Sequence, residues 1–262
     1  MTEEVRDCYD QLAANYHLIF ADWNTSIARQ AGVIGAMLER EGIGSPARIL
    51  DCACGIGTQA LGLAERDYKL TGCDISAVAI ERARREASQR MLSIQFFVAD
   101  VRDLNFLPAN DFDTVVCLDN SLPHLESDEQ LHQAAIEIRK KLRPGGLFLA
   151  SIRDYDRLAQ DRVTVQGPSF FVDSGRRRIV HQVWDWIDER RYTFHLYITR
   201  EKAAGWECHH YASGYRALFR SELTRTIQSV GFVDTRWMMP AETGFYQPIM
   251  IAKTESPTRP AI

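Results

Sequence analysis

The sequence predicts an α/β fold: a doubly wound, mostly parallel seven-stranded sheet with a small antiparallel β insertion. Two observations carry this prediction. Short apolar runs alternate with amphipathic helical segments between about residues 47 and 152, which is typical of βαβ units in a parallel sheet covered on both faces. Farther along the chain, apolar and polar residues alternate strictly, which is typical of half-buried antiparallel strands.

The first element is a helix near the N-terminus. Apolar residues recur there at helical spacing, and two glycines after them are expected to end the helix. The apolar positions are Ile27, Ala31, Ile34 and Leu38, and the glycines are Gly42 and Gly44. We expect residues 1–45 to form an N-terminal helical cap.

The next elements, within residues 46–157, are strands and helices in alternation. Strands are expected at residues 47–52, 69–73, 94–98, 112–118 and 147–152, and helices at 58–65, 76–88 and about 127–142. Ser127-Asp128-Glu129-Gln130 has the pattern of a capping box that begins the third helix. Arg143-Pro144-Gly145-Gly146 is expected to end that helix before the fifth strand.

The later elements divide into an insertion and the end of the core. Residues 158–216 are expected to form the antiparallel insertion, because Tyr192, Phe194, Leu196 and Ile198 alternate with polar residues. Residues 217–254 are expected to return to the core. The strands expected in the insertion are 178–187, 192–199 and 207–216, followed by a helix at 221–230 and core strands at 232–238 and 248–253. Residues 255–262 contain two prolines and no pattern, so we expect a flexible tail.

The charge balance argues against a nucleic-acid-binding protein. The chain has 31 Lys and Arg against 35 Asp and Glu, a formal net charge of −4 at pH 7. Affinity for a phosphate backbone comes mostly from clustered cations, and the densest cluster, Arg176-Arg177-Arg178, has the character of a solvated turn. No apolar run approaches the roughly 18 residues of a membrane span, and the N-terminus is acidic. We expect a cytoplasmic protein without nucleic-acid or membrane partners, and the oligomeric state stays open.

The cysteines and histidines show no metal-binding pattern. None of the six cysteines has the paired two-residue spacing of a zinc site, and the seven histidines are scattered. We expect the cysteines to be reduced and buried, and we expect no metal. The cysteines are Cys8, Cys52, Cys54, Cys73, Cys117 and Cys208.

A glycine turn after the first core strand predicts a nucleotide-binding loop. Gly55-Ile56-Gly57 follows the strand directly, and Asp74 ends the next strand about 20 residues later, where a carboxylate reaches ribose hydroxyls. This pattern alone fits any adenosine cofactor. Asp51 favours S-adenosylmethionine over a nicotinamide dinucleotide, because it would repel a pyrophosphate but could bind an ammonium group. Asp100 is placed to accept from an adenine amino group.

At these residues the sequence resembles the class I S-adenosylmethionine-dependent methyltransferases, which have a Rossmann-like fold, and within them the glycine/sarcosine N-methyltransferase-like group. The wider resemblance covers about residues 5–253. Three segments carry the narrower one: Ile49-Leu50-Asp51-Cys52-Ala53-Cys54-Gly55-Ile56-Gly57-Thr58, Cys117-Leu118-Asp119-Asn120-Ser121-Leu122-Pro123-His124-Leu125, and Leu142-Arg143-Pro144-Gly145-Gly146 with Arg153-Asp154-Tyr155-Asp156. Two positions depart from the group: Asp119 stands where Gly is usual, and Ser151 where His is usual. Both departures concern the acceptor more than the cofactor.

The resemblance implies S-adenosyl-L-methionine as cofactor and S-adenosyl-L-homocysteine as product. It places Ala53, Gly55 and Gly57 around the methionine portion, Asp74 at the ribose, Asp100 and Val101 at the adenine, and Leu118 near the methionine end. Trp23 and Arg29 fall in the N-terminal segment that often closes over such a site, and Arg29 is either a partner of the cofactor carboxylate or a solvated helix residue. Ile75 is expected at the adenine edge, whereas Ser76 is either beside it or a helix N-cap.

Methyl transfer from a sulfonium is an in-line displacement that needs no metal or oxyanion hole, so positioning supplies most of the rate. The candidates for contact with an amine acceptor are Asn120, His124 and Tyr16; His124 could instead cap the following loop, and Tyr16 could be core packing. In the relatives, the position of Arg153 grips the acceptor carboxylate, and Tyr155 follows it. The alternative for Arg153 is an ion pair with Asp154 or Asp156.

The sequence therefore predicts methyl transfer to a small molecule and favours the amine nitrogen of an amino-acid-like acceptor. The alternatives are O-methylation of a small hydroxy compound, an NAD(P)-dependent oxidoreductase, and a non-catalytic protein that binds S-adenosylmethionine.

Overall fold

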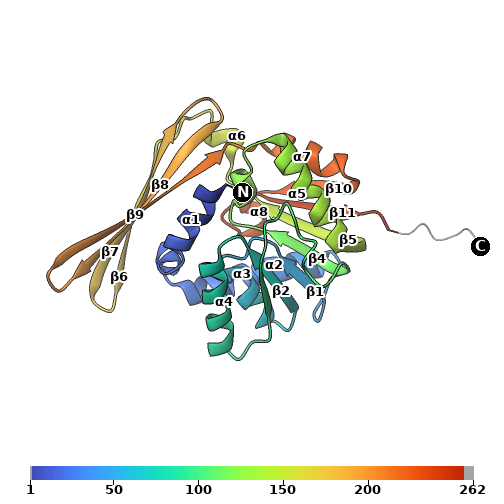
Figure 1. Cartoon of the computed structure of the whole chain (residues 1–262), viewed down its shortest axis with the longest axis horizontal. Helices are drawn as coiled ribbons and strands as arrows, with labels where there is room; N and C mark the ends of the chain where they lie inside the picture. Colours follow the sequence, from blue (N-terminus) through green and yellow to red (C-terminus); the bar gives the residue numbers. More distant parts are fainter. Residues whose placement is uncertain (1, 257–262) are drawn as a thin grey trace, which may run out of the picture.

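Two β-sheets organise the chain in the computed structural model, which describes residues 2–256 (Figure 1). The larger sheet has seven strands in the order β10-β11-β5-β4-β1-β2-β3. These strands are β1 (Arg48–Asp51), β2 (Lys69–Asp74), β3 (Gln95–Val98), β4 (Phe112–Cys117), β5 (Leu142–Ser151), β10 (Phe232–Met238) and β11 (Ile249–Thr254). β11 pairs antiparallel with both β5 and β10, and the remaining pairs are parallel. The predicted α/β fold is confirmed.

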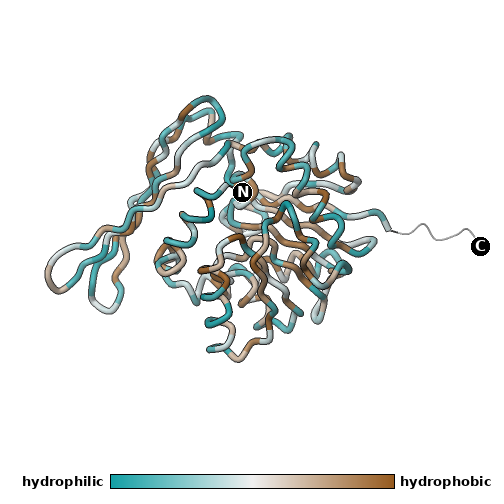
Figure 2. The backbone as a smooth tube through the Cα atoms, in the orientation of Figure 1, coloured by the Kyte–Doolittle hydropathy of each residue, from teal (hydrophilic) through white to brown (hydrophobic). Residues whose placement is uncertain are grey.

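Alternate residues of the central strands face two separate apolar cores. Leu50 and Val115 belong to one core with residues of α5 and α7, whereas Ile49 and Val116 belong to the other with residues of α2, α3 and α4. Because both faces of the sheet are buried, its strands are continuous apolar runs, and Figure 2 shows them as hydrophobic segments inside a more hydrophilic shell. The helices are α1 (Glu3–Leu12), η1 (Tyr16–Ile19), α2 (Trp23–Arg40), α3 (Thr58–Ala64), α4 (Ala77–Gln89), η2 (Leu122–His124), α5 (Asp128–Lys141), α6 (Tyr155–Leu158), α7 (Arg220–Ser229) and α8 (Pro240–Thr243).

The parallel pairing brings several strand ends to one edge of the larger sheet. β1 pairs with β2 on one side and with β4 on the other, and β4 pairs with β5. The connections that follow β1 and β4 therefore lead away from each other, and open α/β sheets bind ligands in the crevice at such a reversal. Asp51, Asp74 and Ser151 end three of these strands.

The smaller sheet is antiparallel, with the order β6-β7-β8-β9, and it extends from the body of the molecule as an arm (Figure 1). Its strands are β6 (Val165–Asp173), β7 (Arg176–Trp186), β8 (Arg191–Lys202) and β9 (Gly205–Arg216). The alternation predicted for β8 is present, because the apolar positions are buried and residues 193, 195 and 197 between them are partly exposed; the buried residues are Tyr192, Phe194, Leu196 and Ile198. α1 packs against β9, so the N-terminal helix lies between the arm and the larger sheet (Figure 1).

One boundary differs from the sequence expectation. Arg143-Pro144-Gly145-Gly146 does not form a separate turn before β5, because the strand already begins at Leu142, which pairs with Phe112. The register then shifts before Thr114 pairs with Leu147, and Gly145 takes a φ of 72° in this irregular stretch. Gly145, which the sequence suggested as a helix terminator, instead provides the positive φ that this irregular strand pairing requires.

The antiparallel sheet contains a strand that the sequence did not indicate. β6 includes Gly167 and Pro168 and runs along the sheet edge, where a shift in register accommodates the proline. The arginine cluster is also not a solvated turn: it begins β7, and Arg178 is buried against Asp173 with an Nε–Oδ2 distance of 2.6 Å. Cys208 is exposed, unlike the other five cysteines.

The tail expected at residues 255–262 lies outside the described residues from 257 onward. Within residues 2–256, every helix is too short or too polar to cross a membrane, and the same residues contain no cluster of three or more side chains suited to a metal ion.

Candidate active site

The glycine loop after β1 is fixed to the end of β2 by hydrogen bonds to Asp74. The Gly55 amide donates to Asp74 Oδ2 at 2.9 Å, and the Ser76 amide donates to Oδ1 at 2.9 Å. Gly55 has a φ of 52° and Gly57 a φ of 95°, in the left-handed region that glycine adopts without strain. Burial raises the pKa of Asp74, while the two amides oppose that effect.

A first pocket opens over this loop. Four residues expected around the cofactor line it: Ala53, Gly55, Asp74 and Ile75. Gly57 does not line the pocket: it ends the loop as the N-cap of α3, where a Cβ would meet Leu61 at 3.3 Å. The sequence-based pattern therefore leads to a real concavity at the carboxyl edge of the sheet.

Asp51 lies beneath the loop and does not line this pocket. Its side chain is 1% exposed, and its Oδ2 atom is buried without a hydrogen-bond partner. Burial raises the pKa of Asp51 to about 8. Trp23 is also buried: its Nε1 donates to Thr58 Oγ1 at 3.0 Å, which ties α2 to the start of α3.

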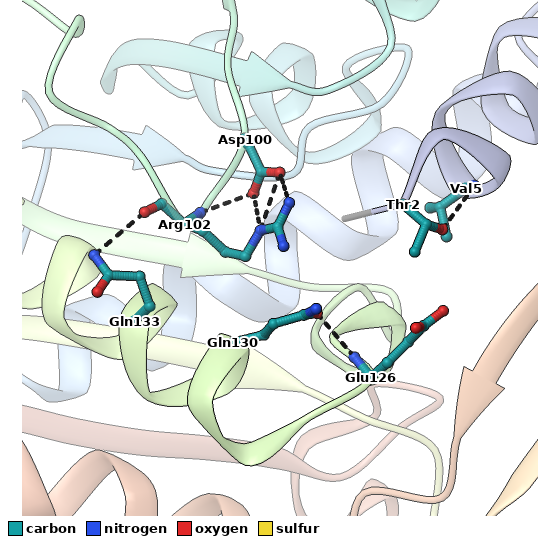
Figure 3. Close-up of polar contacts among 7 residues, drawn as sticks. All are labelled: Thr2, Val5, Asp100, Arg102, Glu126, Gln130 and Gln133. Atoms are coloured by element: carbon teal, nitrogen blue, oxygen red, sulfur yellow. Dashed lines mark hydrogen bonds and ion pairs between the residues drawn. The ribbon is translucent and has the colours of Figure 1, made fainter.

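The three residues expected at the adenine and methionine ends are held mainly by protein groups. Asp100 makes a bidentate ion pair with Arg102, with Oδ2–Nη2 and Oδ1–Nε distances of 2.7 and 3.1 Å (Figure 3). Burial acts to raise the pKa of Asp100, but the bonds from Arg102 bring it below its usual value. Val101 and Leu118 are each 2% exposed, so their side chains belong to the core.

A second pocket adjoins the first. Tyr9, Tyr16 and Asp119 line both pockets. The wall of the second pocket includes Phe194 and Leu196 from the antiparallel sheet. Its charged lining residues are Arg29, Asp119 and Arg153. Arg29 is thus exposed toward this pocket and does not line the one over the glycine loop.

Arg153 extends from the end of β5 into an aromatic enclosure. Its guanidinium carbon lies 4.7, 5.0 and 5.2 Å from the ring centroids of Trp184, Phe194 and Tyr215. Its Nη1 donates to Tyr192 Oη at 2.8 Å. Burial by itself acts to lower the pKa of Arg153, but the phenol oxygens around it raise that pKa above its usual value.

The ion pair considered for Arg153 from the sequence is not formed. Asp154 Oδ1 is instead 2.5 Å from Arg220 Nη1, and Asp156 Oδ2 is 3.4 Å from Arg220 Nε. Arg153 has no carboxylate within ion-pair distance among the described residues. A guanidinium that lines a pocket without a counterion is suited to an anionic ligand.

Asn120 and Tyr155 form a buried network rather than a pocket wall. Asn120 Oδ1 accepts from the Arg153 amide at 2.9 Å, and its Nδ2 donates to Tyr155 Oη at 3.0 Å. Tyr155 Oη is 2.8 Å from Tyr192 Oη, and the Asn120 and Tyr155 side chains are almost fully buried. This network holds the β4 and β5 ends together and orients Arg153, but neither side chain lines either pocket.

His124 lines the first pocket with both ring nitrogens engaged. Nδ1 is 3.0 Å from the Gly214 carbonyl oxygen, so it carries the proton, and Nε2 accepts from Tyr9 Oη at 2.9 Å. Tyr215 packs on the ring with a centroid distance of 3.9 Å. Burial lowers the pKa of His124 to about 3, so the imidazole is neutral at physiological pH. Tyr16 lines both pockets, and burial raises its pKa well above the usual range.

The sequence did not single out four side chains that the fold brings to these pockets. Tyr9 comes from α1, Gln59 from α3, Asp119 from the turn after β4, and Tyr246 from the segment before β11. Asp119 did leave a signal, since it departs from the residue usual in the resembling group. The others have no local signature, because their spacing fits ordinary helix or loop positions.

Comparison with known proteins agrees with this geometry. Residues 49–146 match a family described as a methyltransferase domain. The matched segment of this domain contains β1, the glycine loop, Asp74 and the turn that bears Asp119. The family resemblance stated from the sequence is therefore confirmed.

Relatives with assigned activities match part of the chain. Glycine N-methyltransferase of Rattus norvegicus is 32% identical over 138 residues, which cover 48% of this chain and 47% of the relative. Glycine/sarcosine N-methyltransferase of Parasynechococcus marenigrum strain WH8102 is 30% identical over 158 residues, which cover 60% of this chain and 52% of the relative. The chain thus spans about half the length of these relatives.

Solved structures resemble the chain well beyond the methyltransferase domain itself. An S-adenosylmethionine-dependent methyltransferase of Clostridium acetobutylicum has a TM-score of 0.73 at 16% identity, covering 95% of this chain and 100% of that one. The SAM-bound amino pentose methyltransferase CalS10 of Micromonospora echinaspora has a TM-score of 0.70 at 19% identity, covering 87% of this chain and 91% of that one. At these identities the likeness establishes the fold.

Proposed function

We propose that this chain transfers a methyl group from S-adenosyl-L-methionine to an amine nitrogen of a small, amino-acid-like acceptor. The observation that carries the proposal is the pair of adjoining pockets. One is built from the glycine loop and Asp74, the other contains the unpaired guanidinium of Arg153, and Tyr9, Tyr16 and Asp119 line both. Two ligands bound in these pockets would meet at the shared residues, as a direct transfer between them requires.

The residues of the first pocket fit the adenosyl cofactor. A Cβ at Gly55 would have open space around it, so the loop leaves room for a ligand. Each Asp74 oxygen accepts one amide hydrogen bond and keeps a lone pair for a ribose hydroxyl. When bound, S-adenosyl-L-methionine supplies an electrophilic methyl group on a sulfonium. We assign its contacts to the loop, Asp74 and Ile75, and we assign Trp23, Asp51 and Gly57 to support of the loop.

The residues of the second pocket fit a carboxylate-bearing acceptor. Arg153 supplies a planar guanidinium fork, and its contacts with Trp184, Phe194 and Tyr192 fix it in place. Arg29 adds a second cation at the pocket wall. We assign the carboxylate of the acceptor to Arg153, with Asn120 and Tyr155 as positioning residues. The largely aromatic wall would exclude water, which favours the neutral amine that the transfer needs.

The proposal also gives the parts of the chain separate roles. We assign cofactor binding to residues 46–157 with 217–254, closure over the site to residues 1–45, and the roof of the acceptor pocket to residues 158–216. All six cysteines are free thiols, which is usual for cytoplasmic proteins, so we place the protein in the cytoplasm. We expect small molecules rather than nucleic acids as its partners, in keeping with the net charge of −4.

The test combines cofactor binding with acceptor turnover. S-adenosyl-L-methionine should raise the melting temperature while NAD and NADP should not, and S-adenosyl-L-homocysteine should accumulate only when an acceptor is present. Glycine, sarcosine, other amino acids, amino sugars and hydroxy acids form the acceptor panel. Product formation with amines that carry a carboxylate, and much less with their methyl esters, supports the proposal. Turnover restricted to hydroxy compounds would replace it with O-methylation.

A further inference from the structure

The two positions at which the sequence departs from the resembling group are in direct contact. The Asp119 amide donates to Ser151 Oγ at 2.8 Å, and Ser151 Oγ in turn donates to Gln247 Oε1 at 2.8 Å. Asp119 has a φ of 57°, a conformation that glycine, asparagine and aspartate tolerate best. The turn after β4 is therefore anchored to β5, and the Asp119 side chain has a fixed origin.

The Asp119 carboxylate stands at the boundary between the two pockets. Its Oδ2 accepts from Gln59 Nε2 at 2.8 Å, and Gln59 lines the first pocket. Its Oδ1 accepts from Tyr246 Oη, and Tyr246 lines the second. Each oxygen keeps a free lone pair. No lysine, arginine or histidine lies within ion-pair distance of Asp119 among the described residues.

The second pocket thus contains opposite charges that do not neutralise one another. Arg153 and Asp119 both line it, yet no ion pair joins them. A half-buried carboxylate without a cation is costly unless a ligand supplies one. A small zwitterion offers a carboxylate for Arg153 and an ammonium group for Asp119.

We propose that Asp119 binds the ammonium group of the acceptor and takes a proton from it, so that the substrate class is a small zwitterionic amino acid. This inference rests on the proposed methyl transfer and adds a base that is absent where glycine occupies this position. The other candidate bases are less available. His124 uses its one free lone pair on Tyr9, and Tyr16 is a phenol.

The acceptor nitrogen gives one proton to an Asp119 oxygen, and the electron pair of that N–H bond becomes the amine lone pair. The lone pair forms the new N–CH₃ bond while the C–S bond breaks and its electrons return to sulfur, which gives neutral S-adenosyl-L-homocysteine and a methylated ammonium. Asp119 then releases its proton to water.

The environment of Asp119 suits a proton acceptor. Burial raises its pKa, and hydrogen bonds from Tyr246 and Gln59 oppose that rise. The ionisable groups around it are Tyr16 from η1, Tyr246 from the segment before β11 and, beneath the loop, Asp51. The cations Arg29 and Arg153 line the second pocket together with Asp119 but form no ion pair with it. Burial therefore leaves this carboxylate more basic than an exposed one.

The first experiment is a binding titration that does not depend on turnover. Protein saturated with S-adenosyl-L-homocysteine is titrated with glycine and sarcosine, which carry both charges, with acetate, which lacks the ammonium, and with glycine methyl ester, which lacks the carboxylate. The wild type should bind at least one zwitterion about tenfold or more tightly than acetate. Asp119→Asn and Asp119→Gly should bind zwitterion and acetate equally. Both variants suit the positive φ, so folding should be retained. A wild type without a preference for the zwitterion overturns the inference.

The second experiment separates this role from a structural or cofactor-binding one. With an acceptor from the panel, Asp119→Asn should lower kcat by about a hundredfold and leave the Kd for S-adenosyl-L-methionine within about twofold. Tyr246→Phe is the matched control, because it removes a hydrogen bond to the same carboxylate but keeps the charge, and it should retain the zwitterion preference. A variant that loses cofactor affinity while keeping the preference would reassign Asp119 to the cofactor ammonium. Failure of the wild type to methylate any amine would remove the proposed function, whereas an unchanged kcat in Asp119→Asn would remove only this inference.

Discussion

The two adjoining pockets are built from different kinds of structure. The first is dominated by one stretch of chain, the glycine loop between β1 and α3, with the end of β2. The second collects side chains from α1, η1, α2, the β4 and β5 ends, three strands of the arm and the segment before β11. Backbone geometry therefore defines the first pocket, whereas the chemistry of the second depends on long-range packing of individual side chains.

The largest effect should come from a substitution in the backbone-defined pocket. Gly55→Val places a β-branched residue at a φ of 52°, where such residues are strained, and directs its side chain into the pocket. The Kd for S-adenosyl-L-methionine, measured by calorimetry, should rise by more than about a hundredfold, equivalent to about 2.7 kcal/mol. The matched control is Gly32→Ala in α2, where a Cβ also has open space but φ is ordinary, and it should keep cofactor affinity. A folded Gly55→Val that binds normally would show that the loop is not the cofactor site.

The next effect concerns a side chain in the same pocket. Asp74→Ala removes the hydrogen-bond acceptors for the ribose and for two loop amides. A hydrogen bond to a charged group contributes roughly 1.5–3 kcal/mol, so the cofactor Kd should rise about ten- to a hundredfold. The variant should still fold, with a modestly lower melting temperature without cofactor, because the Gly55 and Ser76 amides lose their acceptors. Equal cofactor affinity in the folded variant would contradict the ribose assignment.

A smaller, more selective effect is expected in the second pocket. Arg153→Lys keeps the charge but loses the fork and the aromatic stacking. The KM for the acceptor should rise about tenfold, with the cofactor Kd unchanged. The KM for the methyl ester of the acceptor should rise less than the KM for the acid. Arg220→Lys is the control, because Arg220 holds Asp154 and Asp156 away from the pocket. It should alter stability rather than KM.

The smallest functional effect is expected at His124, which lines the first pocket but is held by residues of α1 and the arm. With a pKa of about 3, the imidazole stays neutral across the working range, so His124→Gln should leave the shape of the pH–rate profile between pH 6 and 9 unchanged. The same depressed pKa has a consequence for stability. Between about pH 6.5, the unfolded pKa of histidine, and about pH 3, His124 is protonated in the unfolded chain but neutral in the folded chain. The free energy of unfolding of the wild type should therefore fall as the pH is lowered through that window. In chemical denaturation, His124→Gln should make the free energy of unfolding less dependent on pH in this range. If His124→Gln instead removes the acidic or basic fall-off of the pH–rate profile, His124 takes part in proton transfer.

Prediction from the sequence succeeded where the signal was local. Ser127 caps α5 as its spacing indicated, and the strands from β1 to β4 lie within about two residues of their expected bounds. It failed for β6, an exposed edge strand with Gly167 and Pro168 and without two-residue alternation. Burial of Arg178 was equally hidden, since its partner Asp173 sits across a hairpin.

The doubly wound sheet, the glycine loop and the place of Asp74 can be predicted from the sequence, because apolar periodicity and backbone requirements depend on a few consecutive residues. The pairing of Asp154 and Asp156 with Arg220, which leaves Arg153 open to a pocket, emerges only from the folded chain. The tertiary structure also decided that Asn120 supports the site from within and that Asp119 lies between the two pockets. These outcomes depend on which distant side chains meet once the arm, α1 and the sheet edge pack together. Ion pairs and hydrogen bonds between distant residues form only at that stage, so the spacing of residues along the sequence cannot predict them.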